Sequence, residues 1–255
     1  MSRFQRRSSR REGHWLVLAA WPPELAALDR ALPRLSAKLQ ARVTLGSVGV
    51  GLVESAIGSA NLLAKYAPDV VVLVGTAGVY PAYAGKLLPG QVAIAQKVVL
   101  VSESSARKES YLPGPMPSQV HPSRALARRV HRATGSPLVD VACPLAISCS
   151  TRAATVTSEL CGCTLENLEA FAVARAAAVM KVPFAAVLGI ANCVGEHAHR
   201  DWKRNAAAAA EKACQAVLAT LLGLRPAGSL AMRAKGNAVR SDKKTTRSRE
   251  AEVGS

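Results

Sequence analysis

Several common functional signatures are missing from this chain of 255 residues. No uninterrupted apolar run approaches ~18 residues, so no membrane span is expected. The six cysteines form no CxxC pair and fit no common zinc spacing, so we expect no metal site and a reducing, cytoplasmic compartment. The P-loop, GxSxG and HExxH patterns are absent, and Glu54 stands where a dinucleotide-binding GxGxxG would have its third glycine. No cofactor is therefore expected.

Acidic residues are also few, and the excess of positive charge is concentrated toward the two ends. The net charge is +16, of which residues 1–13 carry +4 and residues 223–255 carry +5. Both segments are rich in Ser, Arg, Lys and Gly without a sustained apolar period, which predicts disordered tails. We expect these tails to be solvated, with weak contact to nucleic acid or anionic surfaces as the alternative. Residues 14–222 are then expected to form the folded domain.

Within residues 14–222, short apolar runs alternate with segments of helical period. The runs predict strands at 15–20, 42–48, 69–74, 92–101 and 184–190. Helices are predicted at 23–39, 53–66, 123–133, 164–180 and 201–222. This alternation predicts an α/β fold with three layers, α/β/α, in which a parallel or mixed central sheet is covered by helices on both faces.

Small and polar residues follow several of the predicted strands. Glu24 follows the first strand and Asn192 the last, and the strand at 69–74 runs into a small-residue turn made of Gly75, Thr76, Ala77 and Gly78. Ligands of such sheets bind outside the carboxyl ends of the strands, which favours a small-molecule site here.

Two carboxylates on the predicted helix at 164–180 could face the same site. Glu166 and Glu169 are three residues apart, so on a helix they share one face. Taken alone, the spacing of this pair favours a solvated helix face, and Asn192 could be a turn residue that ends its strand.

Four segments, in order, carry a resemblance to a known family. They are LAAWPPEL (18–25), VGVGLVESAIGSANLL (48–63), DVVVLVGTAGVYP (69–81) and ENLEAFAVARAAAVMKVPFAAVLGIANCVG (166–195). Together they resemble the nucleoside phosphorylase/nucleosidase superfamily, which includes methylthioadenosine/S-adenosylhomocysteine nucleosidases and futalosine hydrolases. The futalosine hydrolases are the most similar, because Asn192 replaces the Asp usual in adenine-releasing nucleosidases and GEHAHRDW (195–202) is similar to their continuation. The resemblance implies the phosphorylase/hydrolase-like fold.

The resemblance also implies a reaction, hydrolysis of the N-glycosidic bond of a purine nucleoside. Glu24 would then orient or deprotonate the attacking water. Glu169 would accept hydrogen bonds from the ribose hydroxyls, with Glu166 as a neighbouring support. The backbone of residues 75–78 would pack against the sugar, and Leu168 stands in place of a Met that precedes the ribose-binding Glu.

Asn192 bears on the leaving base. A 6-oxopurine presents acceptors at both N7 and O6, and an amide has two hydrogens to donate, whereas a carboxyl group has one at most. Asn192 therefore suits hypoxanthine or guanine, and hypoxanthine is the base of futalosine. Leu73 stands where phosphate-using members often have Arg, which favours water as the nucleophile.

Two departures from the family pattern keep other functions open. Leu188 and Ala191 stand where relatives keep an Arg and a Ser. A phosphate-dependent phosphorylase and a non-catalytic nucleoside-binding relative are therefore the alternatives to a hydrolase. The resemblance also implies a homo-oligomer, a dimer or larger.

Overall fold

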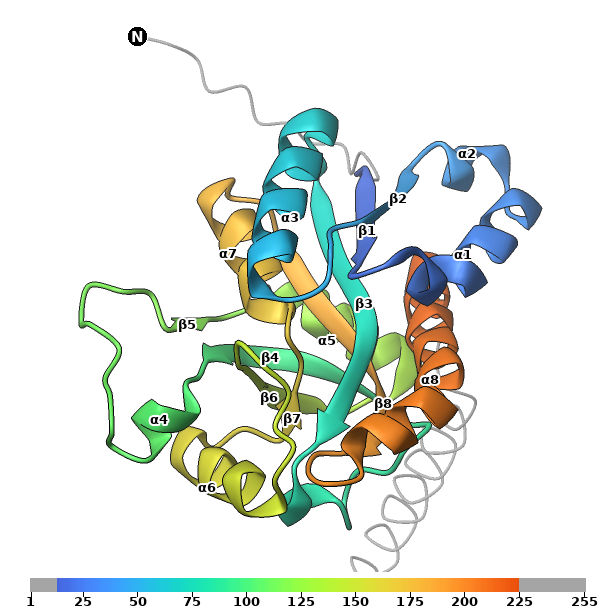
Figure 1. Cartoon of the computed structure of the whole chain (residues 1–255). Helices are drawn as coiled ribbons and strands as arrows, with labels where there is room; N and C mark the ends of the chain where they lie inside the picture. Colours follow the sequence, from blue (N-terminus) through green and yellow to red (C-terminus); the bar gives the residue numbers. More distant parts are fainter. Residues whose placement is uncertain (1–12, 225–255) are drawn as a thin grey trace, which may run out of the picture.

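The computed structural model describes residues 13–224, and a mixed eight-stranded sheet forms its centre (Figure 1). The predicted basic tails lie outside the described residues except for residues 13, 223 and 224. The strands are β1 (Trp15–Ala19), β2 (Val43–Ser47), β3 (Val70–Val79), β4 (Val92–Leu100), β5 (Gln119–Val120), β6 (Leu138–Cys143), β7 (Leu165–Glu166) and β8 (Phe184–Cys193).

The sheet closes on itself on one side. Its main path runs β2-β1-β3-β7-β6-β4-β5, and β8 pairs with both β3 and β4. The pairs β1–β2, β1–β3, β3–β8, β4–β6 and β6–β7 are parallel, and β3–β7, β4–β5 and β4–β8 are antiparallel. Strands β3, β8, β4, β6 and β7 therefore form a closed ring, from which β1 and β2 extend as a parallel wing.

Helices cover both faces of the sheet. They are α1 (Ala26–Ala31), α2 (Ala37–Gln40), α3 (Leu52–Tyr66), α4 (Glu103–Ala106), α5 (Arg124–Thr134), α6 (Thr151–Cys161), α7 (Ala170–Val179) and α8 (Ala198–Leu221). One hydrophobic cluster joins the sheet to α3 and α7, and a second joins it to α1, α5 and α8. The predicted three-layer α/β/α fold with a mixed central sheet is thus confirmed. In the part of the chain that the structure describes, no helix is long and apolar enough to cross a membrane.

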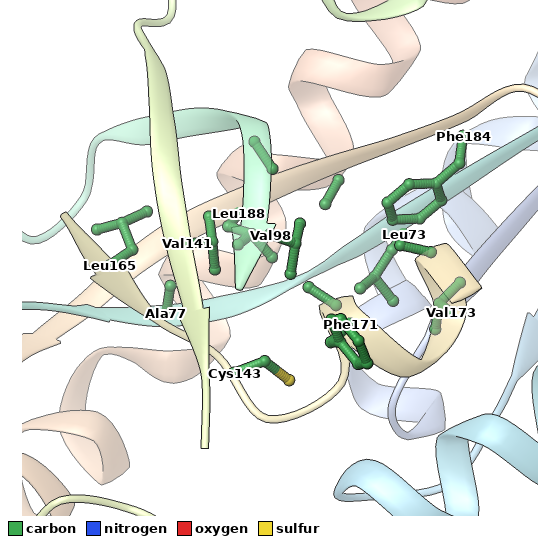
Figure 2. Packing of buried hydrophobic residues seen from close by; sticks show 14 of the residues in the cluster. Leu73, Ala77, Val98, Val141, Cys143, Leu165, Phe171, Val173, Phe184 and Leu188 are labelled. Atoms are coloured by element: carbon green, nitrogen blue, oxygen red, sulfur yellow. The ribbon is translucent and has the colours of Figure 1, made fainter. Parts of the chain in front are cut away.

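Strands β3 and β8 form the centre of the core. Their sequences, VVVLVGTAGV and FAAVLGIANC, are almost continuously apolar, as expected for strands buried on both faces. Along β3 the side chains alternate between the two clusters, with Leu73 in one and Val72 in the other. Figure 2 shows part of the first cluster, in which Phe171 of α7 packs with Leu73 and Phe184.

Three local predictions were wrong. The helix predicted at 23–39 is broken into short pieces, because Pro33 lies inside it and cannot donate a backbone hydrogen bond. The turn predicted at 75–78 is strand, because β3 continues to Val79 along β8. The helix predicted from residue 164 begins at Ala170, because the residues before it form β7 between β3 and β6.

Helix α8 packs so closely on β8 that residue 189 must be glycine. A Cβ atom added at Gly189 would lie 2.0 Å from the carbonyl oxygen of Ala209. We expect Gly189→Ala to lower the free energy of unfolding by at least about 2 kcal/mol, because backbone must move apart. Gly85→Ala is the control, since nothing lies within 4 Å of its added Cβ, and should change it by under about 1 kcal/mol. Equal effects of the two variants in urea unfolding would contradict this packing.

Candidate active site

A cavity of about 370 Å³ lies at the carboxyl ends of β1, β3 and β8. Its volume falls in the range of small-molecule sites. The described residues that line it are Ala20, Trp21, Glu24, Val50, Thr76, Ala77, Gly78, Ile147, Glu166, Asn167, Leu168, Glu169, Asn192, Ala198, His199 and Trp202. The structure thus brings together, around one cavity, every residue that the sequence analysis assigned to the site except Gly75.

Glu24 lies on a short 3-10 helix that two prolines open directly after β1. Its carboxylate is buried and accepts hydrogen bonds from the backbone N–H of Ala20 at 3.1 Å and of Thr76 at 3.2 Å. The Thr76 hydroxyl donates a third, longer bond of 3.4 Å. Gly75 lies behind this carboxylate, because an added Cβ there would be 3.3 Å from Glu24 Oε1. Gly75 therefore makes room for Glu24 and does not line the cavity.

The pKa of Glu24 is raised from 4.5 to about 7. Burial is the largest cause, and the charge of Glu169 adds to it, while the backbone N–H donors lower the pKa. A carboxyl group with this pKa changes protonation near neutral pH. Because the folded-state value lies above the ordinary one, the protonated form is favoured by folding. The protonated Glu24 carboxyl therefore stabilises the fold fully below about pH 4.5, and this stabilisation is lost as the pH rises through about 7.

Glu169 is held by Asn167 and by the loop before α3. Glu169 Oε1 accepts from Gly51 N at 2.9 Å, and Oε2 accepts from Asn167 Nδ2 at 3.1 Å. Asn167 Nδ2 also donates to Thr76 O at 3.0 Å, and its Oδ1 accepts from the N–H groups of Glu169 and Ala170. Burial raises the pKa of Glu169, and these donors counteract that effect. One asparagine thus caps α7 and orients the carboxylate.

Glu166 reaches the cavity from strand β7 and not from a helix. The predicted shared helix face of Glu166 and Glu169 is therefore wrong, because Glu166 lies on β7 and Glu169 immediately precedes the first residue of α7. The Glu166 carboxylate accepts from Ser148 N at 3.1 Å, Ser148 Oγ at 2.6 Å and the Tyr80 hydroxyl at 3.1 Å. Burial raises the pKa of Glu166 and these donors lower it. Glu166 and Glu24 each accept from three protein donors, and the bonds to Glu166 are the shorter ones, at 2.6–3.1 Å against 3.1–3.4 Å.

Asn192 lies near the end of β8, beside Gly78 of β3. Its Nδ2 donates to the carbonyl of Cys193 at 2.9 Å, and no described residue donates to its Oδ1. An added Cβ at Gly78 would lie 2.9 Å from Asn192 Nδ2 and 2.7 Å from Val194 Cγ2, so glycine makes room for this amide. In this conformation the amide retains one N–H and its carbonyl oxygen for a ligand.

The first turns of α8 add two aromatic residues to the cavity wall. Trp202 Nε1 donates to Thr76 Oγ1 at 3.0 Å, and the Thr76 hydroxyl in turn donates to Glu24. The ring of His199 stacks on Trp202, with 6.1 Å between ring centroids. Sequence reasoning quoted the segment 195–202 but gave these residues no role. It also missed Asn167, which lies three residues before the start of α7 and accepts from the N–H groups of Glu169 and Ala170.

The charge of the cavity wall is wholly acidic. Three glutamates line it, and no Lys or Arg is among the described lining residues. Leu73, at the position where an Arg would hold phosphate, is buried in the core. Within residues 13–224, no group of three or more His, Cys, Asp or Glu residues is arranged to hold a metal ion.

Comparison with protein-family models identifies the class of this fold and site. The model of the phosphorylase superfamily matches residues 26–222, and the chain belongs to this superfamily. The match confirms the family resemblance of the sequence. A search of curated proteins gave no match.

Solved structures of several enzymes share the fold at low sequence identity. The futalosine hydrolase of Helicobacter pylori superposes with a TM-score of 0.74 at 13% identity, over 85% of this chain and 100% of that one. The methylthioadenosine/S-adenosylhomocysteine nucleosidase of Streptococcus pneumoniae, bound to 8-aminoadenine, gives 0.72 at 20% identity, over 83% and 100%. That of Colwellia psychrerythraea, bound to adenine, gives 0.71 at 18% identity, over 84% and 96%.

Asn167 is the residue whose loss should disturb the site most through structure alone. Asn167→Ala removes two donated and two accepted hydrogen bonds at a buried position. We expect the free energy of unfolding to fall by about 2–4 kcal/mol. Asn61→Ala on the exposed side of α3 is the control and should change it by under about 0.5 kcal/mol. A loss for Asn167→Ala no larger than the control's would show that this network contributes little.

Proposed function

We propose that this protein hydrolyses the N-glycosidic bond of a purine nucleoside. The observation that carries the proposal is a nucleoside-sized cavity whose polar wall consists of three buried carboxylates and two amides, without Lys or Arg. A wall of this charge stabilises the positive charge that develops on the ribosyl group as the bond to the base breaks. Membership of the phosphorylase superfamily supports the same reaction class.

Glu24 is the proposed base. Water attacks C1′ of the ribose, a C–O bond forms, and the bond between C1′ and the purine nitrogen breaks. Glu24 accepts the proton that the water loses, and the departing base takes up a proton in turn. A base with a pKa of about 7 is suited to this step at neutral pH, because about half of it is ionised and the ionised form is basic enough to accept a proton.

Glu169 is the proposed ligand of the ribose hydroxyls. Gly51 and Asn167 each donate to one of its oxygens, so the carboxylate is fixed in direction before substrate arrives. Each carboxylate oxygen can accept further bonds from hydroxyl groups. Glu166 is proposed as a support, since Ser148 and Tyr80 already occupy its oxygens. Leu168 and residues 76–78 supply the apolar wall of the sugar site.

The base is proposed to be a 6-oxopurine, and a 6-aminopurine is the second candidate. Two donors from Asn192 suit a 6-oxopurine, but this requires that its amide leave the Cys193 carbonyl. With that bond kept, one N–H and one oxygen remain, and they match N7 and the amino group of a 6-aminopurine. The distinction therefore depends on whether the bond to Cys193 breaks when substrate binds.

Water is the proposed nucleophile. A phosphate dianion placed beside Glu24 and Glu169 would be repelled by both, and no described lining residue offers a compensating cation. The departures at Leu188 and Ala191 count less against catalysis than the sequence suggested. Both side chains are fully buried outside the cavity wall, so they remove no polar group from it.

The homo-oligomer and the cytoplasmic location stay predictions. An apolar strip beside the cavity mouth supports the first: Val50, Val53 and Ile57 are 60%, 61% and 54% exposed. Val50 also lines the cavity, so a second copy bound over this strip would lie next to the substrate. Nucleic-acid contact through the basic tails concerns residues outside the described range.

The direct test is base release in phosphate-free buffer. We expect free hypoxanthine from inosine or futalosine, and Glu24→Gln should reduce kcat by about 10²–10⁴-fold, because the amide cannot accept the proton. Glu54→Gln on the exposed side of α3 makes the same charge change outside the cavity and should keep full activity. Adenosine and methylthioadenosine in the same panel decide between the two base classes.

The panel has two contradicting outcomes. Turnover that requires added phosphate would identify a phosphorylase. Binding of nucleosides, seen as thermal stabilisation, without release of any purine would identify a non-catalytic relative.

The pH dependence tests the role of Glu24 separately. If Glu24 is the base, kcat/KM of the wild type should fall about tenfold for each pH unit below about 7 and level off above it. In parallel, replacing Glu24 by Gln should raise stability at about pH 8 more than at about pH 5, because the ionised carboxylate is the form that folding disfavours. A flat profile of kcat/KM from about pH 5 to 8 would exclude Glu24 as the titrating base.

A further inference from the structure

A second concave region lies between β4, β6 and the start of α5, away from the active-site cavity. Its volume is about 570 Å³, and the two share no lining residue. Four cationic or basic side chains line it, namely Lys97, His121, Arg124 and Arg128, together with one carboxylate, Asp140. We refer to this region as the basic recess.

The positive charge of the basic recess is only partly balanced by the protein. Lys97 Nζ forms an ion pair with Asp140 Oδ2 at 2.7 Å, which neutralises that pair. The guanidinium groups of Arg124 and Arg128 make no hydrogen bond or ion pair with any described residue. They are four residues apart on α5, so the two like charges share one helix face and repel each other. Helix α5 contains no acidic residue that could relieve this repulsion.

The walls of the basic recess include apolar surface. Ala127 and Pro122 are buried there, and Leu138 lies at the start of β6. The volume falls within the range of sites for small molecules. A concave site with an apolar wall and two unpaired guanidinium groups suits a compact ligand that joins a ring to a phosphate. Guanidinium groups bind phosphate oxygens through paired, charge-assisted hydrogen bonds.

We propose that the basic recess binds a phosphate-bearing small molecule of the nucleotide class. Arg124 and Arg128 hold the phosphate, and the apolar wall contacts the remainder of the ligand. Asp140 keeps Lys97 beside the site without cancelling the charge of the two arginines. This site is separate from nucleoside cleavage, and it stands whether or not the proposed hydrolysis is correct.

The test is titration calorimetry of the full chain with pyrophosphate and with AMP. Arg124→Gln/Arg128→Gln should weaken binding of both probes about tenfold or more, because two charge-assisted contacts are lost. Arg132→Gln/Arg204→Gln is the matched control. It removes the same charge from exposed positions outside the basic recess and should leave both affinities within about twofold.

Competition and a third variant locate AMP. AMP in the basic recess should be displaced by pyrophosphate and should bind equally well to Glu169→Gln. If Glu169→Gln abolishes AMP binding while the Arg124/Arg128 variant keeps it, AMP occupies the active-site cavity. That result would overturn the proposal. If the Arg124/Arg128 variant and the Arg132/Arg204 control weaken probe binding equally, binding depends only on the overall positive charge. That result would also overturn the proposal.

A polyanion control covers the remaining alternative. If neither probe binds at about 1 mM while a single-stranded oligonucleotide does, the basic recess belongs to a nucleic-acid surface and the small-molecule proposal is wrong. If none of the three binds, the proposal is wrong as well. Since the exchanged arginines are exposed and their side chains make no hydrogen bond or ion pair with the described residues, the variants should unfold within a few degrees of the wild type.

Discussion

The parallel pairing of β3 with β8 is the interaction on which both the core and the site depend. These two strands make the largest contribution to the interior, and each is buried on both faces. Their register places Gly78 beside Asn192. Thr76 of β3 also forms hydrogen bonds with Glu24, Asn167 and Trp202. A shift of this register by one residue would exchange the faces of β8 and remove Asn192 from the cavity.

The chemistry of the cavity rests on carboxylates that are satisfied by neutral donors. Backbone N–H groups, hydroxyls and one amide hold Glu24, Glu166 and Glu169, and no described cation pairs with them. Such donors fix the direction of a carboxylate without cancelling its charge. This negative potential suits the proposed reaction, in which the substrate becomes positive as the bond breaks. Burial raises the pKa of each carboxylate, most clearly for Glu24.

Much of the fold and several site residues could be predicted from the sequence, because local signals determine them. The apolar runs of β1, β3 and β8 are long enough to be identified as strands, and the order of the four family segments pointed to Glu24, Glu169 and Asn192. The two-residue strand β7 could not be predicted, because its existence depends on pairing with β3 and β6. For the same reason Glu166 was placed on a helix that starts four residues later.

Other features of the site could not be predicted from the sequence, because they depend on contacts between distant segments. Trp202 lies 126 positions from Thr76 in the sequence, and the family resemblance of the segment 195–202 does not predict which residue Trp202 contacts. The bond between Asn192 and the Cys193 carbonyl is local, but its presence depends on strand geometry that the sequence does not reveal. It alters the donor count on which the choice of base was argued.

Helix α8 has a consequence for how substrate reaches the cavity. It carries Trp202 and His199 over one side of the cavity, and it is locked to β8 where Gly189 meets Ala209. A helix of 24 residues fixed in this way cannot swing open like a loop. A small molecule would then enter and leave on the other side of the cavity, where Trp21, Val50 and Ile147 have exposed side chains. Anything that covers those three apolar residues would therefore also control access to the cavity, without contacting its carboxylates.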